Sequence, residues 1–195
     1  MQFSTAALTA LLATSAVASP TWGHGGDKKN HWLDKWDKND YKHEKVFYFD
    51  KTIIVKAEPD QVRNGTTPVP GQPSAKGLFK FGINVEENTI CYNITLSGVT
   101  GDYQSPALTA THIHEAARGT SGPPRLAFPN PKGPDDRRVS YGCLTGPFKT
   151  GVPGPDGADT GANFHVEQIV ANPAGFFCDS HTKQFPLGAV RGQLA

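Results

Sequence analysis

The chain has 195 residues, a formal net charge of +1 and 37% hydrophobic residues. A charge this close to zero gives no electrostatic reason to expect nucleic acid or an anionic membrane surface as the main partner. The hydrophobic fraction excludes a chain that is disordered throughout. The 21 glycines and 16 prolines favour many short strands and turns over long helices.

Residues 1–18 are predicted to be a secretory signal peptide. Residues 6–17 form a small, apolar run without charge, and the Ala-Val-Ala tripeptide that ends at Ala18 supplies the small-residue cleavage pattern. The run is shorter than the roughly 20 apolar residues that cross a bilayer. We therefore expect an exported, soluble protein with no transmembrane anchor.

Residues 19–45 are hydrophilic and rich in His, Trp, Lys and Asp, so we predict a flexible N-terminal segment. Two alternatives remain open for it. The segment could be a weak metal-attracting tail through His24, His31 and His43, or an aromatic anchor for carbohydrate or cell wall. The composition changes at residue 46, and we expect one β domain from there to residue 195.

Two N-glycosylation sequons begin at Asn64 and Asn93. Their presence fits the secretory route that the leader predicts. Because Asn93 lies in a strand-like run, a glycan there requires that its face of the sheet reaches solvent. We predict an exported glycoprotein.

The chain has three cysteines, an odd number. In an oxidising compartment, one disulfide and one leftover thiol are expected. Cys91 and Cys143 each lie in a strand-like run, and we predict that these two pair. Cys178 is then free, either buried as a small hydrophobic side chain or available for an intermolecular bond.

Beyond residue 45, short apolar runs alternate with Gly/Pro-rich loops, which is typical of an antiparallel sandwich or barrel. The pattern predicts strands at residues 46–49, 52–57, 77–85, 89–96, 108–115, 139–144, 175–181 and 189–194. The third and fourth of these runs are separated by a turn-like segment and are expected to form a hairpin.

Three segments break the strand pattern. Residues 119–136 and 150–161 are rich in Gly and Pro, and we expect both to be surface loops. Residues 163–170 are predicted to be a strand or a short helix. Asn172-Pro173 ends that element, because the residue before proline is disfavoured in the helical region.

The strongest candidate for chemistry is a pair of histidines. His112 and His114 lie two residues apart, so in a strand their side chains share one face. Asp179 and His181 share a face of a later strand in the same way. If the two faces meet, three imidazoles converge near a carboxylate that could orient one of them from outside the ligand shell. Such a set suits copper or zinc.

Two other interpretations of these histidines remain open. They could form structural hydrogen bonds at the edge of a β core, or they could serve in proton transfer or ligand contact. The candidate metal ligands are thus His112, His114 and His181, with copper, or zinc, as the candidate ion. No residue is assigned a catalytic role, and whether the chain is an enzyme stays undecided.

Several short motifs follow one another along the chain: Thr111-His112-Ile113-His114-Glu115, Gly119, Gly122-Pro123, Gly142-Cys143, Ile169 with Ala171-Asn172-Pro173, Phe176-Phe177, His181-Thr182 and Gly188-Ala189-Val190-Arg191-Gly192-Gln193-Leu194. This ordered set resembles the CHRD domain, first described in chordin. The resemblance covers roughly residues 46–195, and the secreted layout is similar to the single-domain fungal members. It implies an all-β, antiparallel Greek-key or immunoglobulin-like sandwich with long Gly/Pro-rich loops and no general enzymatic activity.

A shorter resemblance joins residues 112–115 to the His-x-His-Glu strand of copper/zinc superoxide dismutases, which are also Greek-key β proteins. The two resemblances lead to two hypotheses of function. The first is a secreted extracellular or cell-wall-associated protein with a binding or structural role, whose partner is an extracellular protein or a cell-wall polysaccharide. The alternative is a copper-binding redox protein of the dismutase type.

Overall fold

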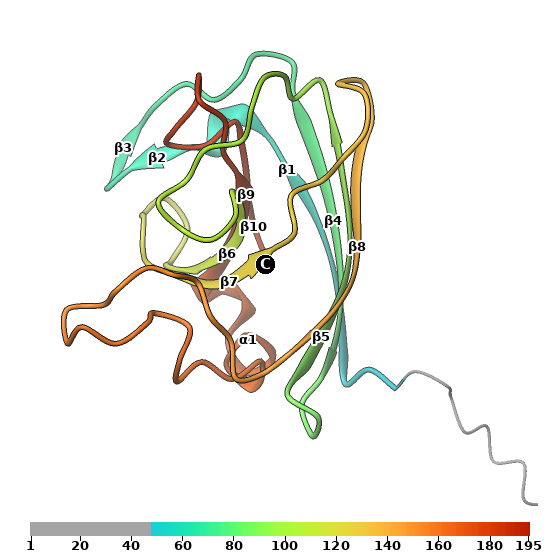
Figure 1. Ribbon diagram of the computed structural model, residues 1–195, viewed down its shortest axis with the longest axis vertical. Coiled ribbons are helices and arrows are strands. Elements are labelled where there is room, and N and C mark those ends of the chain that lie inside the picture. Colours follow the sequence, from blue (N-terminus) through green and yellow to red (C-terminus); the bar gives the residue numbers. More distant parts are fainter. Residues whose placement is uncertain (1–47) are drawn as a thin grey trace, which may run out of the picture. The chain divides into compact units, whose positions relative to one another are not determined.

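The computed structural model describes residues 48–195. The predicted leader and the hydrophilic segment at residues 19–45 lie outside the described residues. The described part consists mainly of two four-stranded antiparallel sheets, and Figure 1 shows them as two facing layers. The predicted all-β antiparallel sandwich is confirmed. Within residues 48–195, no helix is both long and apolar enough to span a membrane.

The first sheet has the strand order β1-β4-β5-β8. Its strands are β1 (Lys51–Ala57), β4 (Lys76–Asn84), β5 (Thr89–Ser97) and β8 (Arg138–Thr145). In β5, Ile90, Tyr92, Ile94 and Leu96 are buried, and the residues between them are not. This period of two gives the sheet one core face and one solvent face. The predicted hairpin is the β4–β5 pair.

The second sheet has the strand order β10-β9-β6-β7. Its strands are β6 (Thr111–Glu115), β7 (Pro124–Phe128), β9 (Phe176–Ser180) and β10 (Val190–Gln193). A small hairpin pairs β2 (Arg63–Asn64) with β3 (Thr67–Pro68) outside both sheets.

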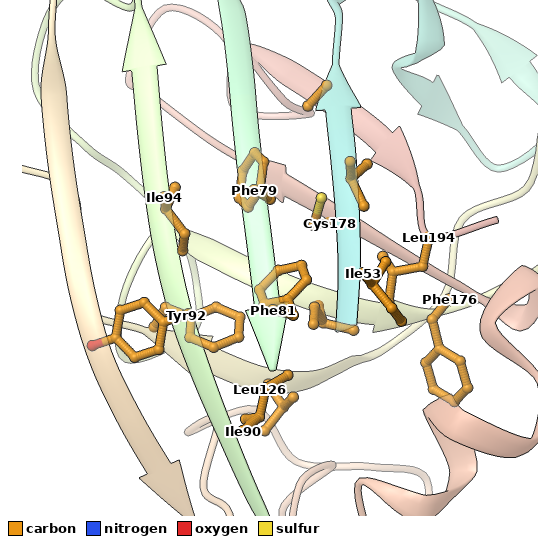
Figure 2. Packing of buried hydrophobic residues seen from close by; sticks show 14 of the residues in the cluster. Ile53, Phe79, Phe81, Ile90, Tyr92, Ile94, Leu126, Phe176, Cys178 and Leu194 are labelled. Carbon is orange, nitrogen blue, oxygen red and sulfur yellow. The ribbon is translucent and has the colours of Figure 1, made fainter. Parts of the chain in front are cut away.

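The core lies between the two sheets. Figure 2 shows Phe79, Phe81 and Tyr92 of the first sheet pointing toward the layer that carries Leu126 and Cys178. The ring centroids of Phe81 and Phe128 lie 5.6 Å apart. Because alternate residues of each strand fill this space, the residues between them must point away from the core. On the second sheet, that outward face carries the histidines.

The prediction that residues 119–136 form only a surface loop is wrong, because β7 lies within them. Leu126 and Phe128 are fully buried and supply the core contact that makes this segment a strand. The strand is at the edge of its sheet, where a proline such as Pro124 is tolerated because no further ladder is needed. The high proline and glycine content of the segment hid this short alternation.

The helical elements are short. The segment at residues 163–170 contributes to α1 (Glu167–Ala171), so it is helical rather than a strand. Asn172 ends this helix, and the 3-10 turn η2 (Pro173–Gly175) follows it directly. A second 3-10 turn, η1 (Pro59–Gln61), follows β1. The buried Ile169 of α1 joins the hydrophobic core and closes one side of it.

The predicted disulfide is confirmed: Cys91 on β5 and Cys143 on β8 face each other in register and are bonded. Cys178 is a free thiol buried in the core, and burial raises its pKa well above the ordinary value. Asn64 and Asn93 are both exposed. Their exposure leaves the predicted glycosylation sterically open, and its occupancy stays a prediction.

Candidate metal centre

The registers of the second sheet place His112, Asp179 and Arg191 in one row across three strands. His112 of β6 faces Asp179 of β9, and Asp179 in turn faces Arg191 of β10. His114 faces Phe177 in the next row on the same side. Because directly opposed residues in an antiparallel sheet lie about 4.5–5.5 Å apart, this pairing places the His112 imidazole beside the carboxylate, and His114 lies diagonally across from it.

His181 follows the last residue of β9, and its side chain turns toward the same face. Its Nε2 lies 2.9 Å from Asp179 Oδ2, while His114 Nε2 lies 3.2 Å from that oxygen. His112 Nδ1 lies 3.4 Å from Asp179 Oδ1. One potential ligand atom from each of the four residues lies within 4.8 Å of all the others. The structure thus brings all three predicted histidines together around one carboxylate.

In each of the three histidine rings, the nitrogen that points away from Asp179 is hydrogen-bonded to a backbone carbonyl oxygen. A carbonyl oxygen only accepts hydrogen bonds, so each of these ring nitrogens carries a proton. The three acceptors lie in three different loops. His112 Nε2 donates to Thr109 O at 2.6 Å, His114 Nδ1 to Gly122 O at 2.8 Å, and His181 Nδ1 to Pro186 O at 2.9 Å.

This bonding fixes the tautomer of each neutral imidazole, so the nitrogen that faces Asp179 carries a lone pair. Within residues 48–195, four of these inward atoms are buried without a hydrogen-bond partner: His112 Nδ1, His114 Nε2, His181 Nε2 and Asp179 Oδ1. Lone pairs facing a carboxylate at these distances repel one another. A cation or added protons must therefore lie between them.

The charges of these four residues also require a cation or added protons next to Asp179. Burial acts to raise the pKa of Asp179, but the charges that His114 and His181 carry when each holds a second proton outweigh it, so the pKa lies well below its ordinary value. Burial lowers the pKa of His112, which the carboxylate only partly offsets. At His181, burial is outweighed by the Asp179 charge, so the pKa is raised. The buried carboxylate is stable only next to positive charge.

The β6–β7 connection requires a glycine at position 122. A Cβ on this residue would collide with the backbone carbonyl of Glu115. Only a residue without a Cβ lets the loop return close enough for its carbonyl to accept from His114. The Gly122-Pro123 motif is thus part of the support for the second histidine.

The C-terminal motif at residues 188–194 contains β10. Val190 points into the core, and Gly192 packs so closely on β1 that a Cβ would lie 2.7 Å from a backbone carbonyl oxygen. Arg191 and Gln193 point to the opposite face. Gln193 donates hydrogen bonds to Ala116 O at 2.9 Å and to Ala174 O at 2.7 Å, which ties two loops to the edge of the sheet.

Two further polar residues, one of them a histidine, lie outside the cluster. His165 is exposed next to α1 and does not belong to the four-residue cluster around Asp179. Glu115, which follows the histidine pair, is held by Arg125 at 2.8 Å. Sequence reasoning assigned Asp179 only an orienting role and did not single out Arg191. The period-two spacing of Asp179 and His181 was the available signal for the carboxylate.

A cavity of about 260 Å³ opens above the four donor residues. Its wall also includes Arg63 of β2, Asn64 and Arg191. His112 is almost completely buried at its base, whereas the side chains of His114 and His181 each keep 12% of their surface exposed. The cluster is therefore reachable from solvent through this cavity.

Comparison with known proteins identifies a family. A family model for the CHRD domain matches residues 58–194, which include the four donor residues and both arginines of the cavity wall. No curated protein and no solved structure matches the chain. Because the family model covers well over half of the sequence, the chain belongs to the CHRD domain family.

Proposed function

We propose that this CHRD-domain protein is exported and binds one divalent transition-metal ion through His112, His114, His181 and Asp179. The observation that carries the proposal is the set of buried, unpaired donor atoms that converge on one point. Export is supported by the leader sequence, the two sequons and the Cys91–Cys143 disulfide, which is typical of an oxidising compartment.

The donor set fits such an ion. Three imidazole nitrogens and one carboxylate oxygen suit Zn²⁺ and Cu²⁺, which bind nitrogen at about 2.0–2.1 Å. Two donors on opposite sides of a square-planar Cu²⁺ are then about 4.2 Å apart, and two donors of a tetrahedral Zn²⁺ are about 3.4 Å apart. The present atoms lie within 4.8 Å of one another. Inward shifts of about 0.3–0.7 Å for each side chain therefore suffice.

The surroundings of the ligands also fit. Histidines that bind metal nearly always donate their other N–H to a carbonyl or carboxylate, which fixes the ring and its tautomer. All three rings here do so. As neutral rings, the histidines have no hydrogen-bond partner for their inward nitrogens among the described residues, and these nitrogens could pair with Asp179 only by taking up a second proton. Burial lowers the pKa of His112, which opposes that protonation. The geometry therefore favours metal binding over a purely structural histidine cluster.

The first prediction concerns metal content. The full chain, expressed through a secretory host, equilibrated with Zn²⁺ or Cu²⁺ and dialysed, is expected to retain about one equivalent of metal at the single four-donor site. Elemental analysis by mass spectrometry measures it. His165→Ala is the matched control, because it removes an exposed histidine outside the cluster and should retain the same amount. Retention below about 0.1 equivalent in the wild type would contradict the proposal.

A further inference from the structure

The cavity above the centre is large enough for more than solvent. Its volume of about 260 Å³ is several times the roughly 30 Å³ that one water molecule takes up in the liquid. The donor residues form its base, so a molecule inside it would lie next to the bound ion. What else lines the wall decides which molecule fits.

Arg191 is a rigid part of that wall. It lies directly across from Asp179 in the β9–β10 ladder and is only 4% exposed. Its guanidinium carbon lies 3.5 Å from the ring centroid of Phe177, and Nη2 donates to Thr120 O at 2.6 Å. A guanidinium has five N–H donors, and the described residues provide a hydrogen-bond acceptor for one nitrogen only.

The charges at the cavity are unbalanced. Its lining contains one carboxylate, Asp179, and two guanidinium groups, Arg63 and Arg191. A divalent ion on Asp179 would consume that one negative charge. The loaded cavity then carries an excess of positive charge with free donors.

We infer that the cavity binds a small anion, a carboxylate or an inorganic oxyanion, next to the metal ion and in contact with the Arg191 guanidinium. The inference rests on the proposed metal site. A preorganised guanidinium favours such ligands because its parallel N–H groups match two oxygens of one anion. A neutral ligand would leave the buried arginine without a counter-charge once Asp179 is bound to the ion.

The test uses the full chain loaded with Co²⁺, whose visible spectrum reports on ligands near the ion. Formate and phosphate are titrated separately, so that a carboxylate and a phosphate are distinguished. We expect a saturable spectral change with at least one of them. Arg191→Met should weaken that binding by about tenfold or more, as expected for loss of a charged hydrogen bond. Arg191→Lys should weaken it less, since the charge remains.

Arg118→Met is the matched control. Arg118 is exposed and does not line the cavity, but its positive charge acts on Arg191. This variant should change anion affinity by no more than about twofold, because an exposed charge is screened by solvent. If Arg191→Met does not fold, as judged by thermal unfolding, Arg191→Lys decides alone.

The outcomes separate the two proposals. If the wild type takes up no Co²⁺, the metal proposal fails. If it takes up one equivalent and neither formate nor phosphate changes the spectrum, only the anion inference is overturned. Equal anion affinity in the wild type and in the folded Arg191 variants would also overturn it.

Discussion

Replacing Asp179 with asparagine is expected to remove the stabilisation that metal gives to the protein. At a free metal concentration of 100 times the dissociation constant, binding raises the free energy of unfolding by about 2.7 kcal/mol. For a chain of this size that corresponds to a rise in Tm of roughly 5–10 °C. The amide of the Asp179→Asn variant would keep the shape of the side chain but neither its charge nor its second oxygen acceptor. We expect a metal-dependent shift below about 1 °C in this variant.

The measurement is thermal unfolding of the wild type and of Asp179→Asn, each with Zn²⁺ and with chelator. His181→Ala should behave like Asp179→Asn, since loss of a ligand costs more affinity than the about 10–100-fold that changes to outer partners cost. His165→Ala should retain the full shift. If the metal-dependent rise in Tm of Asp179→Asn were half that of the wild type or more, the ion would have to bind elsewhere.

The double substitution Cys91→Ala/Cys143→Ala is expected to lower the free energy of unfolding by about 4 kcal/mol. The two cysteines are 52 residues apart in sequence. In the chain-entropy account, a disulfide that closes a loop of this length stabilises by about that amount through the unfolded state. Denaturant unfolding under oxidising conditions measures the change.

The same variant tests how independent the two sheets are. The disulfide joins β5 and β8 of the first sheet, whereas all four donor residues lie on or next to the second. The folded variant should therefore bind Zn²⁺ in the same stoichiometry as the wild type. A decrease of less than about 1 kcal/mol in the free energy of unfolding would contradict the stabilising role of the disulfide, because disulfides that close even shorter loops are expected to stabilise by more than this.

The strand pattern in the sequence predicted a sandwich or a barrel and the β4–β5 hairpin, and the resemblance to the CHRD domain implied the sandwich. The disulfide was predicted from the odd number of cysteines and from the strand-like runs that contain Cys91 and Cys143. The period of two also predicted which residues share a face, as with His112 and His114. It did not contain the register between distant strands. That Asp179 faces both His112 and Arg191 depends on how β6, β9 and β10 are aligned, and the core side chains on the other face determine that alignment.

For this reason Asp179 was assigned only an orienting role, and Arg191 was not singled out. Periodicity alone put the carboxylate near the histidines, and the structure places it within reach of all three. The supporting carbonyls were equally beyond sequence analysis, since a backbone oxygen leaves no residue signature. Gly122 was the one visible trace of them, because a close backbone approach requires a residue without a Cβ.

The most direct test of the metal centre is X-ray absorption spectroscopy of the zinc-loaded protein. Three imidazole nitrogens and one carboxylate oxygen are predicted at about 2.0–2.2 Å from the ion. No sulfur is expected, because Cys178 points into the core on the opposite face of β9 from Asp179. A sulfur ligand at about 2.3 Å, or fewer than two imidazoles, would contradict the four-residue centre.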